Sequence, residues 1–267
     1  MTTPMTTPGR RARIFRAAAG LLVLAAALLP SSGVDGQVAP SASRWWEEVA
    51  RVQSLLDEGK WRKAARRAES VREELVRTSW HEPDLGSVLA ELALQAAVAR
   101  AGLGEDEAAL WEWQSALNLE RLGGRSELAG RDLSRHGRSA ELLAGHPLRA
   151  EGQVPQGRQA ATPRPDRDWE PPARREDFVL ATLQNPGAAR ERPDPAVFEL
   201  VIDREGRLLY PVLVSSWSHP VVVQWALDNL RRASPFRPAR MEGQPVEVLW
   251  LIELDLNEVL GGYYGRR

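Results

Sequence analysis

The hydrophobic pattern near the C-terminal end most constrains the fold, because its period changes twice. Apolar side chains alternate along residues 197–203 and again along 207–215, which predicts two strands that each bury one face. Gly206 lies between them, where a tight turn needs a residue that tolerates a positive φ. After Pro220 the apolar residues follow a helical spacing, and alternation returns along 246–256. The sequence therefore predicts a ββαβ unit, a small sheet with one helix across a face.

Six short motifs follow one another in this region. They are Phe198-x-Leu-x-Ile-Asp-x-x-Gly206, Val212-x-Val-Ser-Ser216, His219-Pro220, Ala226-Leu227, Phe236-x-Pro-Ala239 and Gly243-x-Pro-Val246. In this order the motifs resemble the TonB C-terminal domain. Residues 196–257 are therefore identified as a TonB C-terminal-like domain. One departure is Ser234, which stands where the family usually has an aromatic residue.

The resemblance implies how such a domain works. The family's C-terminal domain accepts a peptide strand from outer-membrane transporters at a sheet edge, and it relays energy from an inner-membrane motor of the ExbB/ExbD kind. In strand addition, main-chain hydrogen bonds give affinity and alternate side chains give register. The strand involved would be residues 244–256, if this chain keeps the family's geometry. The candidate partner-binding residues on it are Gln244, Val246, Glu247, Leu249, Leu251, Glu253 and Asp255.

Residues 1–36 have the pattern of a targeting segment. Four arginines between positions 10 and 16 precede an apolar run, residues 17–29. This run is shorter than the ~20 residues that span a bilayer, so a cleaved signal peptide is favoured over an uncleaved anchor. In either case we expect the rest of the chain to be exported to the periplasm. An uncleaved segment would tether it to the inner membrane.

Apolar stripes at helical spacing predict four helices within residues 44–145, with breaks at Gly59 and Gly104. The two resulting helical hairpins indicate an internal repeat. Residues 128–143 are expected to add one or two capping helices.

The hairpins resemble tetratricopeptide (TPR) units. The resemblance rests on Gly59-x-Trp-x-x-Ala64 and Ala109-x-x-x-Trp113-x-x-Ala116, which have the small and aromatic spacings of such repeats. Trp111 and Trp113 lie two positions apart and cannot both point into one helix interface. One of them is therefore expected to be exposed, and both are candidate contacts of the helical region with a partner.

Residues 146–195 are rich in proline and arginine and poor in aliphatic side chains. Such a composition buries too little apolar surface to fold alone, which predicts a flexible linker. Residues 258–267 are expected to form a flexible tail. The expected fold class is α+β, with TPR-like hairpins, the linker and the small C-terminal sheet in that order.

Composition excludes several kinds of chemistry. The chain has no Cys, which rules out disulfides and thiol catalysis, and its net charge of −1 does not favour nucleic acid as a partner. The sequence contains no HExxH, G-x-S-x-G, Walker or G-x-G-x-x-G motif. His81-Glu82-x-Asp84 is interpreted as a solvated loop rather than a metal site. We expect no enzyme, no cofactor and no metal.

The leading interpretation is a periplasm-facing TonB-family protein that binds protein partners, with energy coupling to outer-membrane transport as a further step implied by the resemblance. The first alternative is a non-motor, TPR-type adaptor or scaffold in cell-envelope assembly, whose C-terminal domain is a passive binding module. It is favoured by the absence of a His and of a full membrane span in residues 1–36. A third interpretation is a regulatory subunit or sensor of an envelope enzyme.

Overall fold

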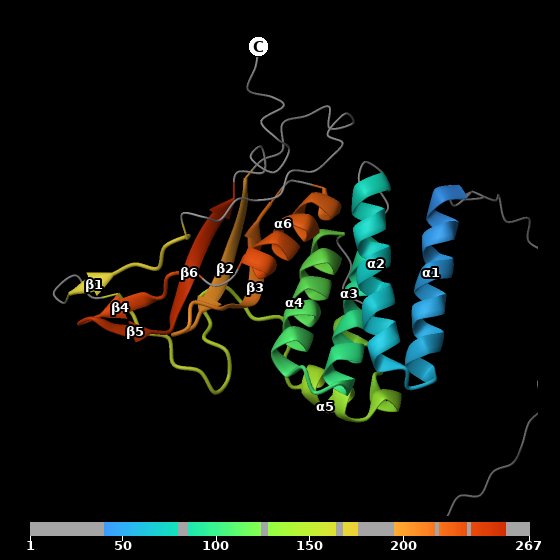
Figure 1. Cartoon of the computed structure of the whole chain (residues 1–267), viewed down its shortest axis with the longest axis horizontal. Helices are drawn as coiled ribbons and strands as arrows, with labels where there is room; N and C mark the ends of the chain where they lie inside the picture. The colour runs from blue at the N-terminus through green and yellow to red at the C-terminus, as the bar shows by residue number, and fades with distance from the viewer. Residues whose placement is uncertain are drawn as a thin grey trace, which may run out of the picture. The chain divides into compact units, whose positions relative to one another are not determined.

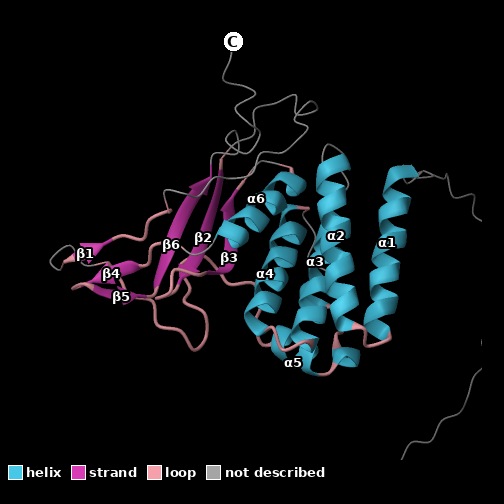
Figure 2. Ribbon diagram, in the orientation of Figure 1, coloured by secondary structure: helices cyan, strands magenta, loops and turns pink. Residues whose placement is uncertain are grey.

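The computed structural model describes residues 40–79, 85–123, 128–163, 168–175, 195–216, 219–233 and 236–254. These residues form six α-helices, two short 3-10 helices and two three-stranded antiparallel sheets, which confirms the α+β class (Figures 1 and 2). The predicted targeting segment and tail lie outside the described residues.

The four predicted helices are confirmed. They are α1 (Pro40–Asp57), α2 (Trp61–Ser79), α3 (Leu85–Gly102) and α4 (Asp106–Leu122). Gly59 and Gly104 interrupt them with φ values of +69° and +80°, a conformation that costs glycine little. The predicted capping region also holds the 3-10 helices η1 (Leu128–Gly130) and η2 (Ser134–His136) and the short helix α5 (Arg138–Ala144).

Helix α3 is the centre of the helical layer. Its residues are buried on every side, and it is in contact with α1, α2, α4, α5 and α6 (Pro220–Ala233). Small residues along it let the neighbouring helices approach. A Cβ on Gly102 would lie 2.8 Å from the Trp61 ring, so the absence of a side chain there admits the indole of α2.

The main sheet has the strand order β3-β2-β6 and confirms the predicted ββαβ unit. Its strands are β2 (Ala196–Ile202), β3 (Leu208–Ser215) and β6 (Val248–Leu254), and α6 lies between β3 and β6 in the chain. Gly206 in the β2–β3 turn has φ +79°, and a Cβ there would lie 1.9 Å from the carbonyl oxygen of Phe236. Only glycine fits this turn.

The predicted long strand 246–256 is wrong in its extent. Residues 244–246 form β5 (Gln244–Val246), which pairs with β4 (Ala239–Met241) and not with the main sheet. A two-residue turn with positive φ at Glu242 and Gly243 joins β4 to β5, and β1 (Trp169–Glu170) adds to β4 in the order β1-β4-β5. Apolar alternation continues through the break, so the pattern did not reveal it.

The helices and the main sheet share one hydrophobic core. Helix α4 packs on β3, and α6 is in contact with β3 and with α2, α3 and α4. The largest fully buried side chains come from both parts, for example Leu89 and Leu92 in α3 and Phe198 and Leu200 in β2. The described residues accordingly belong to one compact unit.

Residues 146–163, here called the strap, lie in the region where we expected a flexible linker, and they make polar contacts with the main sheet and with Glu247. The Arg149 guanidinium is buried, pairs with the Glu199 carboxylate, and donates to the carbonyls of Glu199 (3.0 Å) and Tyr210 (3.2 Å). Further along, Arg158 pairs with Glu247 at 2.6 Å. Composition measures what a segment can bury by itself, whereas the strap is held by polar anchors on another surface. Residues 176–194 lie outside the described part.

Candidate functional site

The structure divides the predicted partner-binding strand between two sheets. Gln244 and Val246 belong to β5, and Leu249, Leu251 and Glu253 belong to β6. Glu247 lies between the two strands, and Asp255 lies outside the described residues. Only the β6 members can therefore form a continuous edge of the main sheet.

The outer edge of β6 has no strand partner in the part of the chain that the structure describes. Among the described residues, β6 pairs only with β2, with a register that runs from Ile202↔Val248 to Ala196↔Leu254. The Glu247 carbonyl accepts the Ala161 N–H of the strap at 2.7 Å. This carbonyl therefore faces outward, which here means away from β2. Main-chain groups alternate between the two edges of a strand, so the N–H and C=O groups of Leu249, Leu251 and Glu253 also face outward.

The two faces of β6 differ in burial. Val248 and Leu254 are buried and Trp250 and Ile252 are partly buried on the core side, whereas Leu251 is 53% exposed on the other side. Trp250 packs only at the margin of the core. The edge position explains this, because no further strand covers the side of β6 away from β2 among the described residues.

The opposite edge of the sheet, on β3, is closed by one side chain. Asn118 of α4 is fully buried, and its amide donates to the Pro211 carbonyl at 2.9 Å. Its side-chain oxygen accepts the Leu213 N–H at 3.1 Å. The amide thus makes the two hydrogen bonds that a neighbouring strand residue would make.

Trp111 and Trp113 are both buried, at 3% and 4% exposure, so the expectation that one of them is exposed is wrong. The Trp113 indole donates to the His146 carbonyl of the strap at 2.6 Å. Helix α4 is covered by α3, β3, α6 and the strap together, and its residues from Ala109 to Glu120 are all buried. The sequence signal for this was present: that stretch of α4 is apolar on more than one face.

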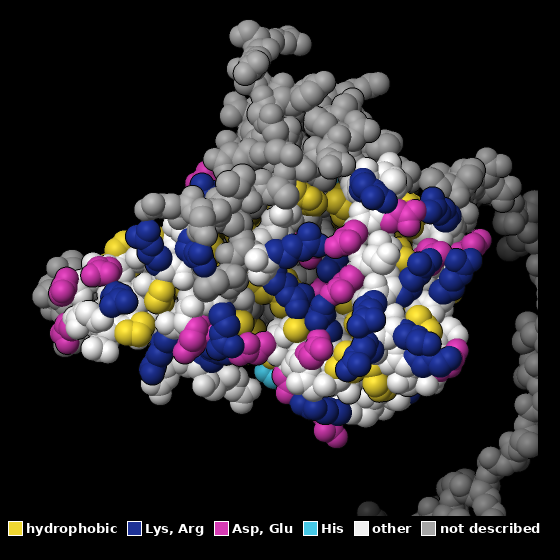
Figure 3. Space-filling model, viewed as in Figure 1, with side chains coloured by type: hydrophobic (Ala, Val, Ile, Leu, Met, Phe, Trp, Pro, Cys, Tyr) yellow, Lys and Arg dark blue, Asp and Glu magenta, His cyan; other side chains and the backbone are white. Residues whose placement is uncertain are grey.

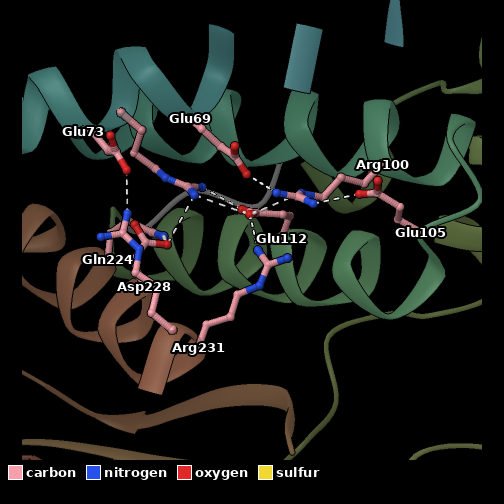
Figure 4. Close-up of polar contacts among 10 residues, drawn as sticks. Glu69, Glu73, Arg100, Glu105, Glu112, Gln224, Asp228 and Arg231 are labelled. Atoms are coloured by element: carbon pink, nitrogen blue, oxygen red, sulfur yellow. Dashed lines mark hydrogen bonds and ion pairs between the residues drawn. The ribbon is translucent and has the colours of Figure 1, made fainter. Parts of the chain in front are cut away.

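A buried ion-pair cluster joins α6 to the helical layer, and sequence analysis missed it (Figure 4). The Glu112 carboxylate is fully buried and is reached by Arg72 (2.6 Å), Arg231 (2.5 Å) and Arg100 (3.8 Å). Arg72 also lies 3.2 Å from Asp228 of α6. The basic residues that the sequence does cluster on α2, Arg62, Lys63, Arg66 and Arg67, are instead exposed. A glutamate between two tryptophans of an apolar helix was the available signal.

The cluster shifts the pKa values of its members in opposite directions. Burial by itself would raise the pKa of Glu112, but Arg72, Arg231 and Arg100 together lower it to about 2. Burial raises the pKa of Asp228 to about 6, because Arg72 compensates only in part and Glu112 adds repulsion.

A cleft of about 420 Å³ opens beside the cluster, and all of its lining residues are charged. They are Glu69, Arg72, Glu73, Arg100, Asp228, Arg231 and Arg232. Arginine and acidic side chains gather here in the space-filling view (Figure 3). The position that an anion would take among the three guanidinium groups is already filled by the Glu112 carboxylate, so the arrangement favours a structural contact over an anion site.

The described residues include neither a helix able to span a membrane nor a cluster able to hold a metal ion. No helix there is both long and apolar enough to cross a membrane. No group of three or more His, Asp or Glu side chains in that part is placed to hold a metal ion.

Comparison with known proteins found no match: no protein-family model, no curated protein and no solved structure is similar to the chain.

Proposed function

We propose that the protein binds an extended segment of a protein partner as an added strand on the outer edge of β6. One observation carries the proposal: β6 is an edge strand with outward main-chain groups at Leu249, Leu251 and Glu253, and no described segment pairs with them. Unpaired edges promote association with other chains, and proteins usually cover or blunt them. The exposed Leu251 side chain beside this edge would gain from being covered.

The added segment would be short. Outward groups at three alternate residues offer pairing over about five residues of β6. At the start of β6, the Ala161 N–H of the strap already occupies the Glu247 carbonyl. An incoming strand would therefore pair beyond this point, with its side chains placed next to Leu251 on one face and Trp250 on the other.

The motif resemblance to the TonB C-terminal domain supports an outer-membrane transporter peptide as the partner, and a periplasm-facing location. Under this first candidate function, the protein is a TonB-family protein that binds the transporter peptide. Coupling of that binding to an inner-membrane motor is a further part of the proposal. Identifying the mature N-terminus tests the location: cleavage between about Gly33 and Gln37 is expected for an exported product. Full-length protein that stays in the inner membrane would instead favour a tethered form.

The second candidate is a non-motor adaptor in envelope assembly, and a specific observation favours it. The sheet is fastened to the helices by a shared core, by Asn118 and by the buried ion-pair cluster. The strap holds the other face of β2 through Arg149 and Glu199. A binding edge carried on such a support suits a scaffold, whereas a transducer works through a domain free to move on a tether.

Proline substitution tests the binding edge. Leu251→Pro removes an outward N–H that the fold does not use, so binding of candidate transporter peptides is expected to be lost while circular dichroism stays unchanged. Leu251→Ala is the matched control, since it removes the side chain and keeps the N–H. Ile252→Pro, one residue further, removes an inward N–H and is expected to disturb the fold itself. Peptide binding by a folded Leu251→Pro protein with unchanged affinity would rule out strand addition at this edge.

A further inference from the structure

The contact between α6 and the helical layer contains a carboxylate whose charge is only partly compensated. Asp228 lies 3.2 Å from the Arg72 guanidinium and accepts a hydrogen bond from the Gln224 amide at 3.0 Å. Arg72, however, already donates to both oxygens of Glu112, at 2.6 and 3.4 Å. One buried cation therefore serves two acidic side chains.

The other charges around Asp228 do not correct this imbalance. Arg231 and Arg100 are directed at Glu112 and Glu69, and Arg232 pairs with Glu73. The charged and titratable groups that surround Asp228 in the described residues are Glu69, Arg72 and Glu73 of α2, Arg100 of α3, Glu112 of α4, and Arg231 and Arg232 of α6. The side chain of Asp228 is 14% exposed, so water solvates it only weakly.

We propose that Asp228 is the proton-binding group of a pH-sensitive contact, and that its protonation makes the packing of α6 against α2 and α4 more stable. Neutral Asp228 removes the repulsion with Glu112 and leaves Arg72 to a single acidic partner. The Gln224 amide can still donate to the protonated side chain. The packing of α6 thus becomes more stable on mild acidification, although the ion pair between Arg72 and Asp228 is lost.

Linkage gives the direction and the pH window. Burial raises the pKa of Asp228 from 3.8 to about 6, so the folded protein binds this proton more tightly than the unfolded chain. The stability from the proton is fully present below pH 3.8 and is lost as the pH rises through 6. Between pH 7.5 and pH 5 the folding equilibrium constant is expected to rise roughly tenfold from this group alone.

Two other groups also make the stability depend on pH. Glu112 does so outside this pH window, and His136 opposes the effect of Asp228 within it. The pKa of Glu112, lowered to about 2, gives stability that is lost only below pH 4.5. Burial also lowers the pKa of His136, which sits in η2, so its contribution falls as the pH drops below 6.5. Both effects are common to the wild type and to an Asp228 variant, and they cancel in the comparison between them.

The test measures unfolding of the full chain in denaturant at pH 5 and pH 7.5. Asp228→Asn is compared with the wild type, and Glu151→Gln, an exposed acid on the strap, is the control for removal of one charge. The wild type is expected to gain roughly tenfold more in its folding constant than Asp228→Asn on going to pH 5. Glu151→Gln is expected to follow the wild type.

Equal pH dependence of the wild type and Asp228→Asn would overturn the proposal. If Asp228→Asn does not fold, the carboxyl carbon resonance of Asp228 in the wild type decides the matter. A titration midpoint near 6 would support the proposal, and a midpoint below 5 would overturn it. The amide protection of α6 relative to α1 should also rise at pH 5, and an unchanged ratio would contradict the assignment to α6.

Discussion

The two edges of the main sheet are treated in opposite ways. On β3, the buried amide of Asn118 satisfies the Pro211 carbonyl and the Leu213 N–H, and α4 covers the strand. On β6, three alternate residues present their main-chain groups outward, and Leu251 is 53% exposed. Both strands have the same partner, β2. The difference lies in what packs beside each edge: among the described residues, α4 covers the β3 edge and no strand pairs with the β6 edge.

The largest effect is expected from opening the closed edge. Asn118→Leu removes both hydrogen bonds and leaves the Pro211 carbonyl and the Leu213 N–H buried without a partner. Each unsatisfied group costs ~1–3 kcal/mol, so the free energy of unfolding should fall by roughly 2–4 kcal/mol in denaturant titrations.

Ser115→Ala provides the matched control for this change. Ser115 is fully buried three residues earlier on α4, and its hydroxyl has no partner among the described residues. Removal of this hydroxyl is expected to be neutral or slightly stabilising. Equal costs for the two variants would mean that the β3 edge does not depend on the Asn118 amide.

A smaller loss is expected from Trp250→Ala on the open-edge strand. A fully buried tryptophan costs ~3–5 kcal/mol on truncation, but Trp250 packs only at the margin of the core. We expect about 2 kcal/mol, measured as a shift of the denaturant midpoint without complete unfolding. A loss as large as for a fully buried tryptophan would indicate that the β6 edge is covered in solution.

The smallest effect is expected from Glu253→Ala. Glu253 is exposed on the outer face of β6, and surface substitutions usually change stability by less than about 0.5 kcal/mol. Its unfolding curve should therefore overlap with that of the wild type. A clear loss of stability would show that another segment packs over this face and that the edge is not free.

Local patterns predicted the elements well. The alternation around Phe198 and Leu200, the turn at Gly206 and the breaks at Gly59 and Gly104 each depend on residues close in sequence, so periodicity and backbone preference suffice. The same reasoning failed where one helix is covered from several sides. Trp111 and Trp113 were assigned by assuming that α4 has one buried face, whereas α4 is surrounded.

The candidate site was predicted only in part. The strand and the order of its faces follow from the alternation of Val248, Trp250 and Leu254 with Leu249 and Leu251. Which edge of the main sheet is covered depends on residues far away in the chain. Asn118 closes β3 across 93 residues, and no local pattern marks an asparagine for that role.

The position of Asn118 also bears on the order of folding. Helix α4 is synthesised before β3 and α6, yet Asn118 finds its hydrogen-bond partner Pro211 only in β3, 93 residues later, and Glu112 gains Arg231 only with α6, 119 residues later. Until those segments are made, the Asn118 amide has no partner in β3 and Glu112 lacks Arg231, while the indoles of Trp111 and Trp113 lie on a helix that is buried in the complete fold. Contacts of such long sequence separation slow folding. We therefore expect the N-terminal helices to be an incomplete folding unit that is prone to aggregation until the C-terminal quarter of the chain has joined them.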